Sequence, residues 1–373
     1  MYEMKRTTTL LLSALILAAL LFLAPPLAAP AAAADCYRYA GDLYVCDARP
    51  TQAVFSGPAY REHSLFYERD YAWLADDTPL YAAPRSDAPI TEEPTKGLLF
   101  YTIEDTAVDG AGMTWYKVSD TEWARGDTMH LYTESQLTGM NIHSRPERPF
   151  GWVMDRFRPA PAPDTEAPEN APLLEIYTFV QIYDVAEGSD GWLWFDIGND
   201  QWVKQPHLAL VDVTERPDDV AEDEYWVEVD LFEETFAAYE GDRMVYAGLT
   251  ATGLEGFETN EGLFTVYARH REWPMWGGEV GEDFYFLQDV PHTMFFDDEI
   301  ALHGAYWHNS FGAPRSHGCV NMTPRDAEWV WFWSENAPND LWVYVHSRPQ
   351  EYFMERYGGE LAGGNSTHLS LGH

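Results

Sequence analysis

The stretch LHGAYWHNSFGAPRSHGCVNM, from Leu302 to Met322, decides how the C-terminal part of this chain is interpreted. It holds three of the twelve histidines and the only cysteine that follows residue 46. Histidine and cysteine bind zinc, but they also serve as base and nucleophile in acyl transfer. The three histidines with Cys319 match no closed zinc pattern, so a nucleophile with its base is the stronger hypothesis and a metal hydrolase the weaker one.

Composition limits the class of protein. The chain has 373 residues, 15% of them aromatic, which is enough for two or three folded domains with real cores. The formal net charge of −38 would repel nucleic acid and anionic lipid, so we expect no nucleic-acid partner.

The first 34 residues predict a secretory signal. Lys5 and Arg6 precede a long apolar run, and AAAADC offers a cleavage site after Ala34. We therefore expect export to the cell envelope or the medium, with an uncleaved membrane anchor as the alternative, because the run nearly spans a bilayer.

Export makes the cysteine count informative, because the compartment is then oxidising. Only Cys36, Cys46 and Cys319 exist. Cys36 and Cys46 flank a short segment and can close a small loop within the N-terminal segment 35–70, which leaves Cys319 as an odd thiol. A buried structural cysteine is the plainer interpretation of that thiol.

An internal duplication precedes the C-terminal domain. Residues 73–131 align without gaps on residues 152–210 at an offset of 79, and 14 of the 59 positions are identical. Chance would give roughly four. Short β-rich runs between turns predict a small antiparallel barrel in each copy, at 71–135 and 150–213.

The pattern G-x-x-W-[YF]…W in each copy resembles bacterial SH3-like domains. That resemblance implies binding to the cell wall, with a mere spacer as the alternative. An acidic linker is predicted at 214–223, a mostly β domain at 224–348 and a loose tail at 349–373. One helix is expected after Cys319, with Thr323 as its N-cap and Pro324 at its first position.

SHGCVN at residues 316–321, with His303 sixteen residues before the cysteine, resembles the signature of YkuD-type L,D-transpeptidases. Supporting pieces follow in the family's order, among them TNEGLFTV at 259–266 and VPHTMFFDDEIALHG at 290–304. Two positions depart from the pattern: Asn260 replaces a proline, and Asn321 stands where many members have arginine.

The resemblance implies a β-rich catalytic domain with Cys319 as nucleophile and His303 as general base, oriented by the Gly304 carbonyl. It also implies that backbone amides around His317, Gly318 and Cys319 stabilise the oxyanion. The chemistry agrees, because a cysteine is mostly protonated at pH 7 and needs an imidazole to take its proton.

Roles for the other residues of the stretch are weaker expectations. Ser316 would fix the loop through its hydroxyl group and His317 would shape the pocket, while His308 and His292 are expected to be bystanders. The residues proposed to contact the substrate are Arg315, Asn321, Tyr306 and Trp307.

The function expected from the resemblance is an L,D-transpeptidase that acts on tetrapeptide stems of peptidoglycan through a cysteine acyl-enzyme and forms 3-3 cross-links. No cofactor or metal is expected, and carbapenems are expected to acylate the same cysteine. Two alternatives stay open: an L,D-carboxypeptidase that hydrolyses the same acyl-enzyme, and a noncatalytic wall-binding protein.

Overall fold

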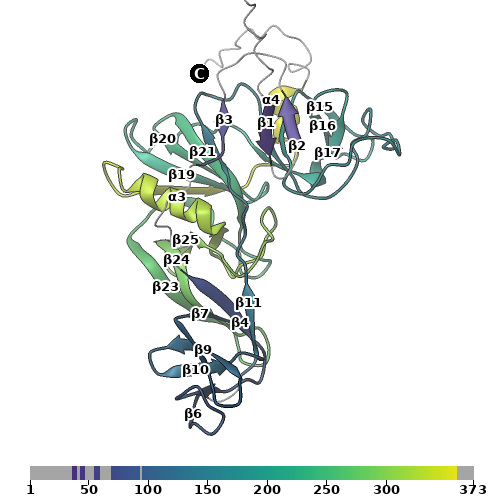
Figure 1. The fold of residues 1–373 in the computed structure, drawn as a ribbon. Coiled ribbons are helices and arrows are strands. Elements are labelled where there is room, and N and C mark those ends of the chain that lie inside the picture. The colour runs from purple at the N-terminus through teal and green to yellow at the C-terminus, as the bar shows by residue number, and fades with distance from the viewer. Residues whose placement is uncertain (1–35, 40–42, 47–53, 59–68, 93–94, 359–373) are drawn as a thin grey trace, which may run out of the picture. The chain divides into compact units, whose positions relative to one another are not determined.

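The structure, a computed structural model, describes residues 36–39, 43–46, 54–58, 69–92 and 95–358 (Figure 1). The chain divides into two units, 1–53 and 54–373, and each is described by itself. In the first unit, β1 (Cys36–Tyr39) pairs antiparallel with β2 (Leu43–Cys46), and the register sets Cys36 opposite Cys46. The disulfide between them stays a prediction.

The predicted signal, residues 1–34, lies outside the described residues. Within the described ranges, no helix is long and apolar enough to cross a membrane.

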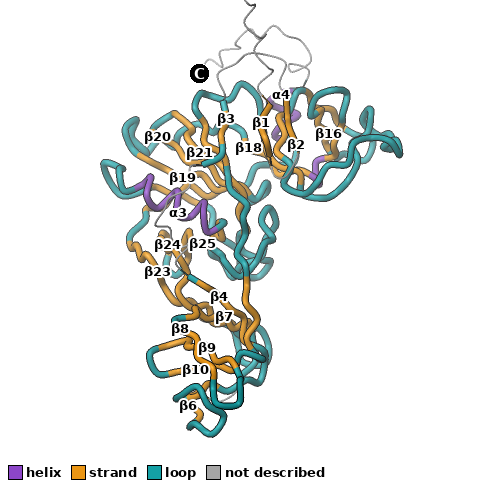
Figure 2. The backbone as a smooth tube through the Cα atoms, in the orientation of Figure 1, coloured by secondary structure: helices purple, strands orange, loops and turns teal. Residues whose placement is uncertain are grey.

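The second unit is mainly β, as predicted, and strands dominate the backbone trace (Figure 2). Its largest sheet runs in the order β11-β4-β7-β24-β25-β26-β21-β20-β19-β27-β22, and β3, β12 and β23 pair at its sides. The strands from the C-terminal domain are β19 (Tyr225–Asp230), β20 (Thr235–Glu240), β21 (Arg243–Ala251), β22 (Gly262–Thr265), β23 (Ala268–Gly277), β24 (Tyr285–Asp297), β25 (Ile300–Gly304), β26 (Val320–Met322) and β27 (Trp342–His346).

One helix, α3 (Pro324–Ser334), covers the strands that carry the sequence motif (Figure 1). Thr323 is its N-cap, and the Thr323 side chain accepts a hydrogen bond from the Asp326 amide at 3.1 Å, which confirms the predicted start of the helix. Its buried side chains Ala327 and Val330 pack in the core cluster that also contains Val320. The helix thus covers β26, the strand that begins directly after Cys319, and buries it in the core.

The first β unit is joined to this sheet. Its strands β4 (Asp70–Leu74), β7 (Leu98–Ile103) and β11 (Met129–Tyr132) extend the sheet, because β7 pairs parallel with the first residues of β24. A separate sheet of five strands completes the unit: β5 (Leu80–Tyr81), β6 (Ile90–Glu92), β8 (Asp105–Val108), β9 (Thr114–Ser119) and β10 (Glu122–Arg125). This continuity joins the predicted first barrel to the sheet of the C-terminal domain. Its physical reason is the length of β24, whose first residues extend beyond β25 and would otherwise leave unpaired backbone groups.

The second β unit repeats the strand order of the first. It consists of β13 (Phe150–Val153), β14 (Phe179–Gln181), β15 (Asp184–Glu187), β16 (Leu193–Asp196), β17 (Trp202–Lys204), the 3-10 turn η1 (Gln205–His207) and β18 (Leu208–Val211). Adding 79 to the bounds of β8 and of β11 gives the bounds of β15 and of β18. The strand pairings correspond as well, with β13 between β14 and β18 as β4 lies between β7 and β11. The duplication is therefore structural, whereas its SH3-like character stays a prediction.

Two further short strands pair with each other, β3 (Phe55–Ser56), which precedes the first β unit in the chain, and β12 (Met140–Ile142), which follows it. β12 also pairs with β21. The predicted loose tail is wrong for its first residues. Helix α4 (Tyr352–Tyr357) follows β27, and Phe353 is buried in the core of the second β unit. Burial of this aromatic side chain fixes a segment whose composition looked like a tail.

Residues 214–223 are also better fixed than a solvated linker would be. Val220 is fully buried, and Arg216 pairs with Asp242 at 2.9 Å. A buried ion network adjoins this segment: Arg348 binds Glu228 and Asp230, each at 2.6 Å. Burial alone would raise the pKa of Glu228, but Arg348 and hydrogen bonds from His346 and Thr214 hold it below its ordinary value.

Replacing Arg348 with leucine is expected to lower the free energy of unfolding by about 3–5 kcal/mol, because it leaves two buried carboxylates without their cation. Urea denaturation measures this change. The matched control is Arg85→Leu, which breaks the exposed pair between Arg85 and Asp87 and should cost less than about 1 kcal/mol. Equal effects of the two changes would contradict the role given to the buried network.

Candidate active site

Two neighbouring parallel strands bring the motif histidine and the motif cysteine together. In the register of β25 and β26, His303 lies opposite Asn321. Cys319 immediately precedes β26, and its thiol donates to the Glu299 carbonyl at 3.6 Å, just before β25 begins. Neighbouring strands lie about 4.8 Å apart, and residues two apart on a strand share a face. A separation of sixteen residues thereby becomes a pair of side chains on one face of the sheet.

The loop before Cys319 is tightly bonded. The Ser316 hydroxyl donates to the Cys319 carbonyl at 2.5 Å and accepts from the Gly318 amide at 3.1 Å. Gly318 has a φ of +114°, a conformation that side chains other than glycine rarely adopt. The Gly318 carbonyl accepts from the Thr259 hydroxyl at 2.7 Å, which ties the loop to the turn at residues 259–262.

The thiol of Cys319 is protonated at rest. Burial raises its pKa to about 11, the Ala301 amide partly opposes that shift, and the charge of Glu299 adds to it. The side chain is only partly buried, so a reactant has access to it. A thiolate at neutral pH therefore requires transfer of the proton to a base.

His303 is almost fully buried and uncharged. Burial lowers its pKa to about 4, and the backbone of Gly304 partly opposes the shift. Nδ1 of His303 makes no hydrogen bond of normal geometry among the described residues. The ring packs face to face with Trp307, with centroids 5.6 Å apart. His303 is thus a neutral imidazole that can accept a proton.

Gly304 allows the backbone to pack closely. A Cβ atom at this position would lie 3.0 Å from Cα of Pro324 and 2.9 Å from the ring of Pro291. A larger residue would therefore separate β25 from the start of α3.

His317 lies at the rim of the site, partly exposed. Its Nε2 is 3.6 Å from the Asp283 carboxylate, and its ring packs against Phe257 and Tyr285. Sequence reasoning did not single out Asp283, Phe257 or Tyr285, because they lie 34 to 62 residues before Cys319 and only the fold brings them to it. Burial raises the pKa of Tyr285, and the nearby sulfur of Cys319 contributes.

The other expected contacts differ in their surroundings. Trp307 packs on His303, and Arg315 is exposed near His308, whose pKa its charge lowers. Tyr306 is a correction: it is fully buried, stacks on Tyr71 with centroids 3.7 Å apart, and donates to the Gln288 carbonyl. A side chain packed in that way has no surface left for a substrate.

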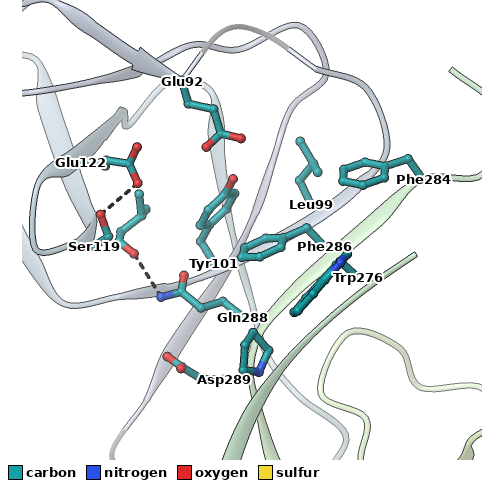
Figure 3. A pocket seen from close by; sticks show the side chains of 12 residues that line it. Glu92, Leu99, Tyr101, Ser119, Glu122, Trp276, Phe284, Phe286, Gln288 and Asp289 are labelled. Carbon is teal, nitrogen blue, oxygen red and sulfur yellow. Dashed lines mark hydrogen bonds between the residues drawn. The ribbon is translucent and has the colours of Figure 1, made fainter. Parts of the chain in front are cut away.

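A cavity of about 420 Å³ lies elsewhere, between the first β unit and the hairpin of β23 and β24 (Figure 3). Tyr101, Trp276 and Phe286 contribute its aromatic lining, and Gln288 joins the two parts by a hydrogen bond to the Val118 carbonyl. Phe286 faces this cavity, whereas Tyr285, one residue earlier on β24, faces His317. The cavity and the cysteine therefore lie on opposite faces of β24.

In the part of the chain that the structure describes, no group of three or more His, Cys, Asp or Glu side chains could hold a metal ion.

Comparison with known proteins concerns the C-terminal part of the chain. Residues 224–354 match the model of the YkuD family, described as the L,D-transpeptidase catalytic domain. This segment is a YkuD-type L,D-transpeptidase catalytic domain. The chain is 25% identical to "Putative L,D-transpeptidase YciB" of Bacillus subtilis over 140 residues. This alignment covers 34% of this chain and 68% of that protein.

Two solved structures are similar to the transpeptidase domain. The L,D-transpeptidase (Yku) of Stackebrandtia nassauensis is 24% identical, with a TM-score of 0.27, over 35% of this chain and 60% of that chain. The catalytic domain of the Enterococcus faecium L,D-transpeptidase acylated by ertapenem is 20% identical, with a TM-score of 0.29, over 34% of this chain and 99% of that chain. The chain thus spans less than two thirds of the Stackebrandtia structure.

Proposed function

We propose that this protein is a cysteine-dependent L,D-transpeptidase that forms 3-3 cross-links between peptidoglycan stems. The observation that carries the proposal is the placement of His303 on β25 and of Cys319 directly before the adjacent strand β26. A neutral imidazole beside a protonated thiol is the starting state for nucleophilic acyl transfer.

The proposed reaction has two covalent steps. His303 takes the proton of the Cys319 thiol as the sulfur attacks the carbonyl carbon before the terminal D-residue of a tetrapeptide stem. The C–N bond breaks, the D-residue leaves as an amine that receives the proton, and an acyl-enzyme remains. An amine of a neighbouring stem then attacks the thioester and restores the thiol.

Backbone amides next to the sulfur are the proposed donors to the oxyanion. The Gly318 amide is occupied by the Ser316 hydroxyl, so we assign the role to the amides of His317 and Cys319. Each such donor typically contributes about 3 kcal/mol to the transition state.

The rate of acylation is expected to fall as the pH drops through about 4, because protonated His303 no longer accepts the proton. It should be level at neutral pH and rise again toward pH 11, where the thiol ionises by itself. Stopped-flow acylation across pH 3.5 to 11.5 measures this profile. A single rise centred near pH 6.5, the ordinary pKa of histidine, would contradict the burial of His303.

The test of the function is product analysis after incubation of the protein with a tetrapeptide stem. Cross-linked dimers with release of the terminal D-residue support the proposal. Tripeptide alone would indicate hydrolysis and the carboxypeptidase alternative, and unchanged substrate would favour a noncatalytic wall-binding protein.

We further propose export to the cell envelope, with the two β units of residues 71–135 and 150–213 binding the cell wall. The predicted signal at 1–34 and the structural duplication support this proposal. Binding of a Cys319→Ala variant to purified wall sacculi tests it, because that variant separates binding from turnover.

Carbapenems are proposed as covalent inhibitors. A strained β-lactam carbonyl is an electrophile like the stem carbonyl, and ring opening would leave an acyl group on Cys319.

A further inference from the structure

His308 was expected to be a bystander, but its contacts give it a defined place in the site. The ring is buried, and burial lowers its pKa to about 3, with Arg315 and His303 contributing. It is therefore a neutral imidazole with one donor nitrogen and one acceptor nitrogen.

The hydrogen bonds of His308 decide which nitrogen carries the proton. The Ser310 amide donates to Nδ1 at 3.2 Å, so Nδ1 must be the acceptor and Nε2 must carry the hydrogen. Nε2 lies 3.0 Å from Nδ2 of the Asn321 side chain. A donor at Nε2 requires an acceptor opposite, because an acceptor at both nitrogens would need an imidazolate.

This requirement fixes the Asn321 amide. The nitrogen and the oxygen of a side-chain amide are told apart only by their hydrogen bonds. A turn of the Asn321 amide by 180° exchanges them and places Oδ1 opposite Nε2–H of His308. With Nδ2 toward His308, the other end of the amide is Oδ1, which is buried and makes no hydrogen bond among the described residues. Once the amide is turned, that end is the NH₂ group, on a residue that lies opposite His303 in the sheet.

We propose that His308 is a positioning residue: its Nε2–H holds the Asn321 oxygen and thereby presents the Asn321 NH₂ group to an oxygen of the bound acyl donor. The ligand class is a carbonyl or carboxylate oxygen of that donor. A buried donor without a partner is costly, and a substrate oxygen would remove this cost on binding.

The test compares two replacements of His308. Glutamine keeps a donor where Nε2–H was, whereas phenylalanine keeps the ring shape and loses the donor. His308→Phe is expected to lower the second-order rate of Cys319 acylation by a carbapenem about tenfold, the effect of one hydrogen bond, and His308→Gln to stay within about threefold of the unchanged protein. The control His130→Phe, at an exposed site in the first β unit, should leave the rate unchanged.

A double-mutant cycle tests whether His308 acts on the acylation rate through Asn321. In an Asn321→Ala background, His308→Phe should cost less than about twofold, because there is no amide left to position. Thermal melting of each variant establishes that it is folded. Equal rates for His308→Phe and the unchanged protein, equal losses for His308→Phe and His308→Gln, or additive losses in the cycle would each overturn the proposal.

This inference rests on the proposed function only for the identity of the ligand. Long-range ¹H–¹⁵N NMR of histidine-labelled Cys319→Ala protein reads the tautomer without any turnover. A proton on Nε2 of His308 is expected, and a proton on Nδ1 would overturn the proposed amide orientation. If the unchanged protein is not acylated at all, the proposed function fails and the NMR result still decides the positioning of Asn321.

Discussion

Replacing Cys319 with alanine is expected to abolish covalent labelling by a carbapenem and to lower cross-linking at least about 10⁴-fold, because no other group in the site can form the acyl-enzyme. Intact-protein mass spectrometry and product analysis measure the two effects. The loop should keep its shape, since its internal hydrogen bonds come from Ser316, Gly318 and Thr259, and the substitution removes only the long contact of the sulfur with the Glu299 carbonyl.

The matched control for this change is the double variant Cys36→Ser/Cys46→Ser, which leaves Cys319 as the only thiol of the chain. It is expected to retain both labelling and cross-linking. Labelling that persists in Cys319→Ala, or that disappears in the double variant while the protein stays folded, would contradict the assignment of the nucleophile.

Replacing His303 with glutamine is expected to lower the rate of acylation about 10²–10⁴-fold, the usual contribution of a general base. Glutamine keeps a polar side chain of similar length but cannot take the thiol proton at neutral pH. The rate of the variant should then depend on ionisation of Cys319 alone, whose pKa is raised to about 11 by burial.

The pH profile separates loss of the base from simple disruption. In His303→Gln, the decrease near pH 4 should vanish, and the rate should rise about tenfold per pH unit up to the thiol pKa. A variant that is uniformly slow, with the decrease near pH 4 retained, would show that another group is the base.

Sequence reasoning reached the parts of the structure that depend on local signals. Thr323 and Pro324 predicted the start of α3, because capping is decided within one turn. The SHGC motif and its spacing from His303 singled out two residues that the pairing of β25 with β26 brings to one face of the sheet. The duplication gave the strand order of the second β unit once the first was known.

Sequence reasoning did not predict the contacts between distant segments. Nothing in the sequence near Leu98 indicates that β7 pairs with β24, and that pairing makes the first β unit part of the catalytic sheet. Tyr306 looked like a substrate contact because its position resembles one that lines the donor site in the family, yet it stacks on Tyr71 from the first β unit. Local pattern reports which residues are polar or aromatic, whereas the fold decides what lies against them.

His308 illustrates the same limit for the site itself. Its role depends on the Ser310 amide, two residues away, and on Asn321 in the next strand, so only the three positions together reveal the tautomer. Asn321 appeared in the sequence only as a departure from the arginine of many family members. In the structure, this residue has a buried side-chain amide that contacts His308.

The central claim is that Cys319 forms a covalent acyl-enzyme with a stem peptide. The most direct measurement is peptide mapping by mass spectrometry after rapid acid quenching of the full chain with a tetrapeptide donor and no acceptor. The account predicts a tripeptidyl adduct on the peptide that contains Cys319, lost on treatment with hydroxylamine as a thioester should be. Turnover of the donor with no adduct at that peptide, or an adduct on another residue, would contradict it.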